Sequence, residues 1–458
     1  MANTYLYKAQ PGVGSSIKST FSGWIKLAND NLTGGIYGQY YNANYNFDIC
    51  LQTGNLEVAD YLVNQYKMRK RTTQKLRDLN AWYHIYVAID RSLSTAADRT
   101  KVYINGERVT DFQSAEDANY TQQTSGSHDG NCKMNNLGGS TDFSRVGIRY
   151  DGNEFDGSMS HIYWIDGSVI DIAQFGSTDS TTGEWKINTN PTIASFGQTG
   201  FLCLKDGNTI TDQSPNSNNF TSSGSGVTKT EDCPSNVFCT WNPFTNFYAN
   251  ATFSNGNNTV FFNNTNEKHI LATLGMNSGK FYWESKLVSH SGNSLAKVGI
   301  ESSLHNDAGG YAVDSYGYRG EGGGGGGATN SGRKVNNGTF TNWGSSYTAG
   351  DIIGCAVDLD NNKIYFSKNG TWQESGDPTS GSTGTGSAFN LIAPVSGFYH
   401  PSIGKEASAT ATWSMNFGNG YFGTTAVSSA GTNASGNGIF EYDVPTGYTA
   451  LSTKGLNT

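Results

Sequence analysis

The acidic residues with the best spacing for hydrolytic chemistry are Glu154 and Asp156, which flank Phe155. A glycoside hydrolase needs two carboxylates on one strand, one as nucleophile and one as general acid. The next position from which a partner acid would project is Met159, which cannot titrate, and Asp156-Gly157 is typical of a turn. No Gly-x-Ser-x-Gly nucleophile motif occurs either. We therefore expect no enzymatic activity.

The cysteines lack the spacing of a metal site. They are dispersed along the chain, at Cys50, Cys132, Cys203, Cys233, Cys239 and Cys355. No Cys-x-x-Cys pair and no Cys/His combination fits zinc. Cys50, Cys203 and Cys355 lie in apolar runs and are expected to be buried free thiols. Cys233 and Cys239 flank a turn at Pro234 and would pair only in an oxidising compartment.

Three clusters of Asp and Asn offer the oxygen ligands that Ca²⁺ prefers: Asp151-Gly152-Asn153, Asp206-Gly207-Asn208 and residues 358–362. The same residues are ordinary turn formers, and none of the clusters has the spacing of an EF-hand loop. We therefore expect turns and no cofactor, with Ca²⁺ as the alternative.

A cluster of aromatic and cationic residues is the candidate binding surface. Tyr311, Tyr316, Tyr318 and Arg319 lie close together in one predicted loop. Tyr and Arg dominate the energetics of binding surfaces, so we predict that these four contact a ligand. The alternative is that the tyrosines only anchor the loop by packing. The six consecutive glycines that follow lack the Gly-Lys-Ser/Thr pattern of a phosphate loop.

Composition indicates a β-rich chain of two or three domains. The 458 residues include 58 Gly, 25 Tyr and 23 Phe, and only 15% are charged. The net charge of −8 argues against a nucleic-acid partner. The basic run 67–77 is typical of a solvated face, with contact to a polyanion or a partner as the alternative. No apolar run reaches membrane-spanning length, and the N-terminus lacks an apolar signal core.

In a β-rich chain, strands and hairpins hold the side chains of any site. The clearest hairpin pattern lies at 350–372. Ile353, Cys355 and Val357 alternate with small or polar residues, and Asn369-Gly370 is a strong hairpin signal. The first half shows a looser parallel, which closes at Asn105-Gly106. Its predicted elements are strands at 21–27, 81–90, 101–104, 146–150, 159–165 and 200–204, a long loop at 112–139 and a short helical turn at 170–175.

The alternation also predicts which side chains are buried. In the first half these are Trp24, Ile85, Val87, Ile104 and Ile162, and in the second half Trp283, Ile353, Val357, Ile364 and Phe366. Trp24 lies opposite Ile25 in the alternation, so it must face the second sheet or a loop. The polar, Pro-containing stretch around 233–247 indicates a boundary, which we place between residues 243 and 244.

The order of motifs in the first half resembles a known family. FSGWIKL, AWYHIYVAID, RTKVYINGERVTDF and FDGSMSHIYWIDG are similar to the laminin-G or concanavalin-like sandwich over 21–204, in versions found in virion proteins of tailed, particularly marine, phages. PSNVFCTWNPFTN looks like the connector that follows the sandwich in those proteins.

The second half resembles the SPRY family. GKFYWESKL, VGIES, GDIIGCAVDLDNNKIYFSKNG, HPSIG and MNFG occur in that family's order over 279–418, with a departure at the glycine-rich segment 311–338. The resemblance implies a partner surface built by loops at one end of the sheets, here 302–318, 319–338 and 373–387. The expected fold is therefore all-β, with two tandem antiparallel sandwiches: a laminin-G-like unit at 1–243 and a SPRY-like jelly roll at 244–458.

These resemblances imply a non-enzymatic virion surface protein, synthesised in the host cytoplasm, that acts as a tail or fibre adhesin. The expected partners are other virion proteins and a host surface glycan or protein, with no nucleic acid, no membrane insertion and multiple copies or a homo-oligomer. The first alternative is a decoration or attachment protein of the capsid or tail. A polysaccharide-degrading enzyme is the second alternative.

Overall fold

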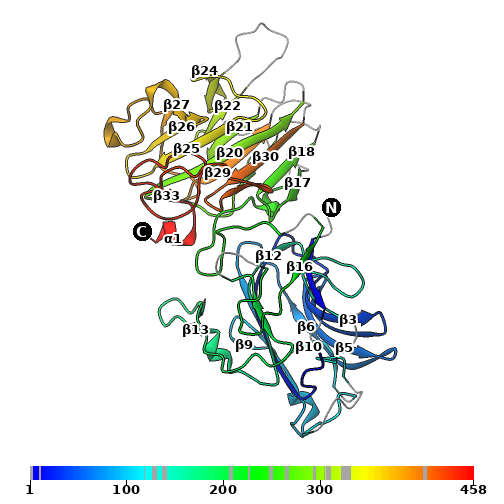
Figure 1. Cartoon of the computed structure of the whole chain (residues 1–458). Helices are drawn as coiled ribbons and strands as arrows, with labels where there is room; N and C mark the ends of the chain where they lie inside the picture. Colours follow the sequence, from blue (N-terminus) through cyan, green and yellow to red (C-terminus); the bar gives the residue numbers. More distant parts are fainter. Residues whose placement is uncertain are drawn as a thin grey trace. The chain divides into compact units, whose positions relative to one another are not determined.

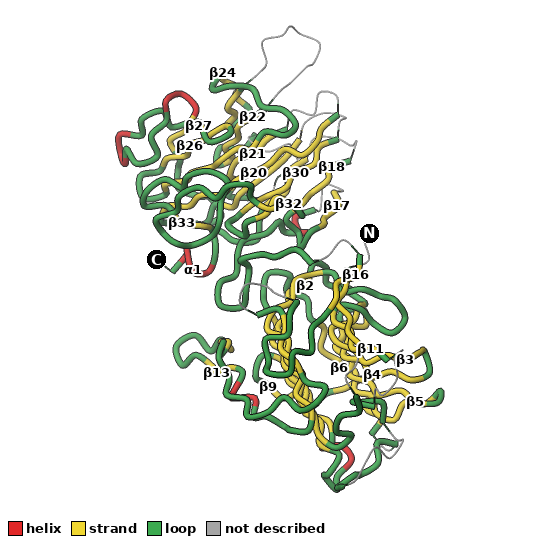
Figure 2. Tube along the Cα trace, viewed as in Figure 1, coloured by secondary structure: helices red, strands yellow, loops and turns green. Residues whose placement is uncertain are grey.

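The regular secondary structure of the chain is almost entirely antiparallel β-sheet, and long loops join the strands (Figure 1, Figure 2). The computed structural model describes residues 4–9, 12–117, 119–125, 132–136, 142–205, 210–224, 227–246, 251–263, 268–291, 296–303, 305, 311–320, 332–405 and 410–457. The chain divides into two compact units, Met1–Lys229 and Thr230–Thr458. None of the helices in the described residues has the length and hydropathy needed to span a bilayer.

The N-terminal unit contains two large sheets. The eight-stranded sheet has the order β10 (Phe112–Glu116), β6 (Gln65–Lys75), β5 (Asn55–Leu62), β4 (Tyr45–Gln52), β3 (Gly34–Asn42), β11 (Phe143–Val146), β1 (Tyr5–Ala9) and β16 (Thr221–Ser223). The six-stranded sheet has the order β15 (Phe201–Cys203), β12 (Gly157–Asp166), β2 (Lys18–Leu27), β7 (Tyr83–Asp90), β8 (Thr100–Ile104) and β9 (Glu107–Arg108). The remaining elements are a hairpin and two short 3₁₀ turns, namely β13 (Gly176–Thr178) with β14 (Trp185–Ile187), η1 (Ala96–Asp98) and η2 (Ile172–Gln174).

One apolar core joins these two sheets face to face. Phe21 of β2 stacks on Tyr37 of β3 with ring centroids 5.9 Å apart, and Phe47 of β4 lies 5.6 Å from Trp164 of β12. Side chains therefore interdigitate between two sheets, which is a β-sandwich. The C-terminal unit repeats this arrangement with different strands.

In the C-terminal unit one sheet has nine strands. Its order is β17 (Ala251–Ser254), β18 (Thr259–Phe262), β30 (Ala411–Asn416), β20 (Lys280–His290), β25 (Ile352–Asp358), β26 (Lys363–Lys368) and β27 (Thr371–Trp372), with β28 (Phe389–Asn390) beside β26 and β33 (Thr449–Ala450) beside β20. The facing six-stranded sheet is β19 (Lys268–Leu271), β29 (His400–Lys405), β21 (Lys297–Glu301), β22 (Ser315–Arg319), β23 (Arg333–Asn336) and β24 (Thr339–Asn342). The short elements are β31 (Tyr421–Phe422), β32 (Thr425–Ala426), η4 (Pro243–Thr245), η5 (Gln373–Ser375), η6 (Gly381–Thr383) and α1 (Thr453–Leu456).

The predicted core residues are confirmed. Ile85, Val87, Ile104, Ile162, Trp283, Ile353, Val357, Ile364 and Phe366 are all buried in the cores between the sheets, and Trp24 is buried on the opposite face of β2. The two Asn-Gly turns also form, with positive φ at Asn105 and Asn369. The strand alternation and the turn chemistry therefore identified the inward faces correctly.

The structure differs from the sequence-based expectation at several places in the N-terminal unit. Strands β5 and β6, the second of which contains most of the basic run 67–77, were not among the predicted elements. Residues 112–116, predicted to begin a long loop, form the edge strand β10. The strand predicted at 146–150 ends at Val146, because Gly147 adopts φ +88° and turns the chain. The short turn predicted at 170–175 is present as η2.

Residues 230–243, expected to belong to a connector, lie in the C-terminal unit. Cys239 and Trp241 are part of its core. The backbone N–H of Cys239 donates to Leu451 O, and that of Trp241 donates to Asn257 O, both over 3.0 Å. The sequence of this segment is typical of a linker, because polar residues interrupt its apolar ones. In the structure, long-range backbone hydrogen bonds fix the segment to the sandwich.

Candidate functional site

The four residues predicted to bind a ligand lie on or just before β22, which is paired on both sides, with β21 and with β23. Strand alternation separates them. Tyr316 and Tyr318 point into the core between the sheets, whereas Arg319 lies on the other face and Tyr311 precedes the strand. The expectation that all four belong to one loop is therefore wrong, because residues 315–319 form an internal strand.

Tyr316 and Tyr318 are only 3% and 0% exposed. The Tyr316 ring lies 5.2 Å from that of Phe389, and its hydroxyl accepts a hydrogen bond from Ile392 N over 3.2 Å. Tyr318 packs 5.4 Å from Phe366 and donates its hydroxyl proton to Ser345 O. Burial raises the pKa of Tyr318 above its usual value. These two rings therefore pack the core between the sheets.

Tyr311 and Arg319 both contact Phe340, a residue that the sequence analysis did not single out. The Tyr311 ring lies 5.9 Å from the Phe340 ring, and the Arg319 guanidinium lies 5.0 Å above Phe340. The Lys297 ammonium lies 4.6 Å from the Tyr311 ring centroid. The outer face of the six-stranded sheet thus carries a small cation–aromatic cluster. Whether any of the four predicted residues contacts a ligand stays a prediction.

The predicted partner loops do not share one end of the sandwich. Asp314 precedes β22 and Gly320 follows it, so the segments 302–314 and 320–332 leave opposite ends of the same strand. Residues 321–331, which contain the six glycines, lie outside the described residues. The third segment, 373–387, runs between β27 and β28 along the edge of the nine-stranded sheet and includes η5 and η6.

Exposed apolar side chains gather at the end where β21 finishes and β22 begins. We define the apolar end surface as Val313, Ile392, Val395 and Phe398, which are between 43% and 69% exposed. Hydrogen bonds hold its segments in place: Ser396 N donates to Ser302 Oγ over 2.8 Å, and Asn336 Nδ2 donates to Val313 O over 2.9 Å.

Sequence reasoning missed the apolar end surface. The available signal was the run Leu-Ile-Ala-Pro-Val-Ser-Gly-Phe at 391–398, in which Pro394 and Gly397 interrupt the strand pattern and leave apolar residues without a core to enter. Exposed apolar groups of this kind, set among polar residues, mark interaction sites.

The possible calcium ligands act as turn formers where they are described. Asp151 Oδ2 pairs with Arg149 over 2.7 Å, and Asp358 accepts from Asn361 N over 2.9 Å. The cluster at 206–208 lies outside the described residues. Within the described part of the chain, no three His, Cys, Asp or Glu side chains are grouped so that they could hold a metal ion.

The cysteines and the paired acids carry no reactive arrangement. All six cysteines are free thiols, and burial raises the pKa of Cys50, Cys203 and Cys355. Glu154 lies in an isolated bridge to Ile148, and Asp156 precedes β12, where its backbone oxygen accepts from Ala28 N. Burial raises the pKa of Asp156.

Comparison with known proteins assigns part of the C-terminal unit to a family. Residues 280–394 match the SPRY domain family. The ATP-dependent RNA helicase DDX1 of Xenopus laevis is 39% identical over 100 residues, which are 22% of this chain and 12% of that protein. Ran-binding protein 9 of Homo sapiens is 33% identical over 94 residues, 20% of this chain and 12% of that protein. The chain thus matches only about an eighth of the length of these relatives.

Solved structures of SPRY domains also match. The SPRY domain of human HERC1 aligns with a TM-score of 0.29 and 22% identity, over 38% of this chain and 96% of that one. The TRIM65 PSpry domain aligns with a TM-score of 0.28 and 15% identity, over 39% of this chain and 89% of that one.

Proposed function

Since residues 280–394 form a SPRY domain, we propose that this chain is a non-enzymatic binding protein and that the apolar end surface contacts a protein partner. The single observation that carries the proposal is the exposure of Val313, Ile392, Val395 and Phe398 on segments fixed by hydrogen bonds. When a partner covers these apolar side chains, their removal from water lowers the free energy of the complex. Because their segments are already held in place, little conformational entropy is lost on binding.

The place of action that we propose is the surface of a tailed-phage virion, where the chain acts as an adhesin of the tail or fibre. This part of the proposal rests on the resemblance of residues 21–204 to laminin-G-like units of phage virion proteins, followed by a SPRY domain. A host surface glycan or protein is the ligand, other virion proteins hold the chain in place, and several copies or a homo-oligomer are present. The names of the Ran-binding relatives suggest that a SPRY domain of this type serves protein contacts.

A decoration protein of the capsid or tail is the second candidate. The same apolar end surface favours it, because a surface of this kind can equally dock the chain onto a virion partner. The two functions predict different consequences when the surface is altered.

The test replaces Val395 and Phe398 by Ser in virions, with Val63→Ser and Val169→Ser as a matched control on exposed valines of the N-terminal unit. An adhesin predicts particles that contain the chain but no longer adsorb to host cells. A decoration protein predicts particles that lack the chain. Normal particles with normal adsorption would contradict both functions of this surface.

A further inference from the structure

The outer face of the eight-stranded sheet in the N-terminal unit carries arginines in a regular arrangement. Strand register places Arg69 of β6, Ala59 of β5, Asp48 of β4, Gly38 of β3 and Arg145 of β11 in one row. At about 4.8 Å per strand, the ends of this row are roughly 19 Å apart. We define the arginine face as four cations and three tyrosines, namely Arg69, Arg71, Arg145, Arg149, Tyr40, Tyr66 and Tyr150.

Three of these arginines stack on the three tyrosines. The guanidinium carbon of Arg145 lies 4.0 Å from the Tyr40 ring centroid. The corresponding distances are 4.6 Å for Arg69 over Tyr66 and 4.6 Å for Arg149 over Tyr150. Stacking fixes each guanidinium plane before a ligand arrives, and a guanidinium can still bind a carboxylate through its N–H edge.

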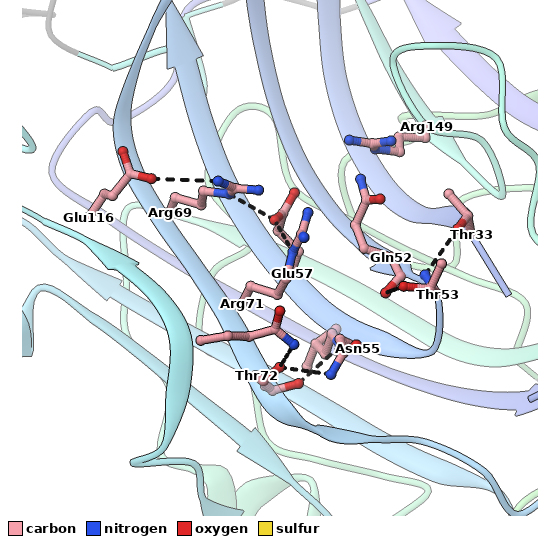
Figure 3. A network of polar contacts seen from close by, with 12 residues as sticks. Thr33, Gln52, Thr53, Asn55, Glu57, Arg69, Arg71, Thr72, Glu116 and Arg149 are labelled. Atoms are coloured by element: carbon pink, nitrogen blue, oxygen red, sulfur yellow. Dashed lines mark hydrogen bonds and ion pairs between the residues drawn. The ribbon is translucent and has the colours of Figure 1, made fainter. Parts of the chain in front are cut away.

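Internal acids neutralise only part of this positive charge. Figure 3 shows buried Glu57 between two arginines: its Oε2 accepts from Arg69 Nε over 2.9 Å and from Arg71 Nε over 2.7 Å. Arg69 Nη1 also lies 3.6 Å from Glu116, and Arg149, which is only 8% exposed, pairs with Asp151 over 2.7 Å. The terminal nitrogens of Arg71 have no partner among the described residues. Arg145 has no ion pair or side-chain hydrogen bond to any other described residue.

Asp48, at the centre of the row, adds little negative charge. Its side chain is only 4% exposed, and Oδ2 has no hydrogen-bond partner in the described structure. Burial raises the pKa of its carboxyl to about 8, so the group is largely protonated at neutral pH. The positive potential of the flanking arginines therefore persists across the row, within a chain whose net charge is −8.

We propose that the arginine face binds an acidic polysaccharide, with the guanidinium groups holding the sugar carboxylates and the tyrosine rings packing against the apolar faces of the sugars. Arg pairs with carboxylates through two parallel hydrogen bonds, and tyrosine offers a flat apolar surface with a polar tip. A nucleic acid fits less well, because the acidic chain as a whole repels a polyphosphate, with its denser charge, more strongly than a polysaccharide that carries one carboxylate per sugar. The inference rests on the proposed binding function and names its glycan.

The experiment measures binding of the full chain to polygalacturonate oligomers by calorimetry at fixed salt, with dextran, polyglutamate and an RNA oligomer as comparison ligands. The wild-type chain should bind polygalacturonate saturably and bind the three others much more weakly. Arg145→Gln should weaken binding about 10- to 100-fold, the loss expected for one charge-assisted contact. Tyr40→Ala should also weaken it, because it removes the ring on which Arg145 stacks. Arg108→Gln removes an equal charge from exposed Arg108 on the other sheet and should leave binding unchanged.

Equal effects of Arg145→Gln and Arg108→Gln would overturn the proposal, provided that both variants keep the wild-type melting temperature. Equal binding of polyglutamate or of RNA would overturn the sugar assignment. If the chain adsorbs to host cells but does not bind polygalacturonate, this inference fails while the proposed adhesin function stands. Binding of polygalacturonate without host adsorption would support the site and reject the adhesin.

Discussion

The indole Nε1–H of Trp185 donates a hydrogen bond to Nδ1 of His84 over 3.0 Å, and this contact holds the β13–β14 hairpin against the six-stranded sheet. His84 Nε2 lies 2.8 Å from Ser22 Oγ, and the imidazole stacks on Trp24 with ring centroids 5.0 Å apart. Because Nδ1 accepts from the indole, the neutral ring carries its proton on Nε2 and donates it to Ser22. This arrangement buries Trp24 on the face of β2 that lies opposite Ile25.

The burial of His84 predicts a pH dependence of stability. Burial lowers the pKa of its imidazole to about 3, whereas the unfolded chain protonates near pH 6.5. The contribution of His84 is therefore complete above pH 6.5 and falls by about 1.4 kcal/mol per pH unit between pH 6.5 and 3. We expect the difference in unfolding free energy between the wild type and His84→Gln to be constant above pH 6.5 and to shrink with this slope from pH 6.5 to pH 5 in urea titrations. A difference independent of pH would show that His84 is not buried as described.

The unit boundary makes a second prediction. Residues 230–458 expressed alone should unfold cooperatively with β-type circular dichroism, and so should residues 1–229. A fragment that starts at residue 244 lacks Phe238, Cys239 and Trp241, three buried residues of the C-terminal unit. Loss of one large core side chain costs about 3–5 kcal/mol, so this shorter fragment should fold poorly or not at all. Equal melting temperatures for the two C-terminal fragments would contradict this boundary.

Sequence reasoning identified the strands whose apolar residues alternate and whose turns carry Asn-Gly. Val357 and Phe366 are buried as expected, because a hairpin with one core face leaves little freedom of register. The pattern could not show that the opposite face is covered as well. Tyr365 points away from the core between the sheets and is still buried, because Phe440 and Tyr448 from the C-terminal segment pack in the same cluster. Those residues are widely spaced in a turn-rich stretch that has no strand period.

The candidate site was harder to predict for a related reason. Tyr316 and Tyr318 have the residue types of a binding surface, but a buried internal strand uses the same aromatic residues. Which use applies depends on pairing with β21 and β23, and that pairing is long-range. The opposite happened with the basic run that includes Arg69 and Arg71, which the sequence analysis interpreted as an ordinary solvated face. It becomes a candidate binding surface only because strand register aligns Arg69 with Arg145.

The core packing of the C-terminal unit gives a third prediction. The Phe366 ring centroid lies 5.4 Å from that of Tyr318 and 6.0 Å from that of Trp343, and the side chain is almost fully buried. Phe366→Ala should lower the unfolding free energy by about 3–5 kcal/mol, and Val357→Ala by roughly 2–3 kcal/mol. Phe261→Ala removes a ring that is 40% exposed and should cost less than about 1 kcal/mol. Chemical denaturation of the three variants measures this order, and a cost at Phe261 equal to that at Phe366 would contradict the assigned faces.

The last prediction concerns Glu284, a buried acid on the outer face of the nine-stranded sheet. Its carboxyl group accepts four hydrogen bonds: from Tyr282 Oη over 3.1 Å, Asn416 Nδ2 over 3.2 Å, Glu441 N over 2.9 Å and Tyr442 N over 2.8 Å. Two of these donors are backbone amides of the C-terminal segment that covers Tyr282 and Tyr365. Glu284 therefore anchors this segment to the sheet.

Glu284→Ala removes the acceptor of four hydrogen bonds, although Asn416 Nδ2 keeps its bond to Ile439 O, and we expect a loss of at least about 3 kcal/mol in unfolding free energy. The amides of Glu441 and Tyr442 should exchange with solvent much faster than in the wild type, because the segment around them opens locally. Glu284→Gln keeps two acceptor positions on one oxygen. Its unfolding free energy and its amide exchange should therefore lie between those of the wild type and Glu284→Ala. Glu231→Ala, at an exposed position of the same unit, serves as the control and should leave both amides protected. Unchanged exchange at Glu441 and Tyr442 in Glu284→Ala would mean that packing of Phe440 and Tyr448 alone holds the segment in place.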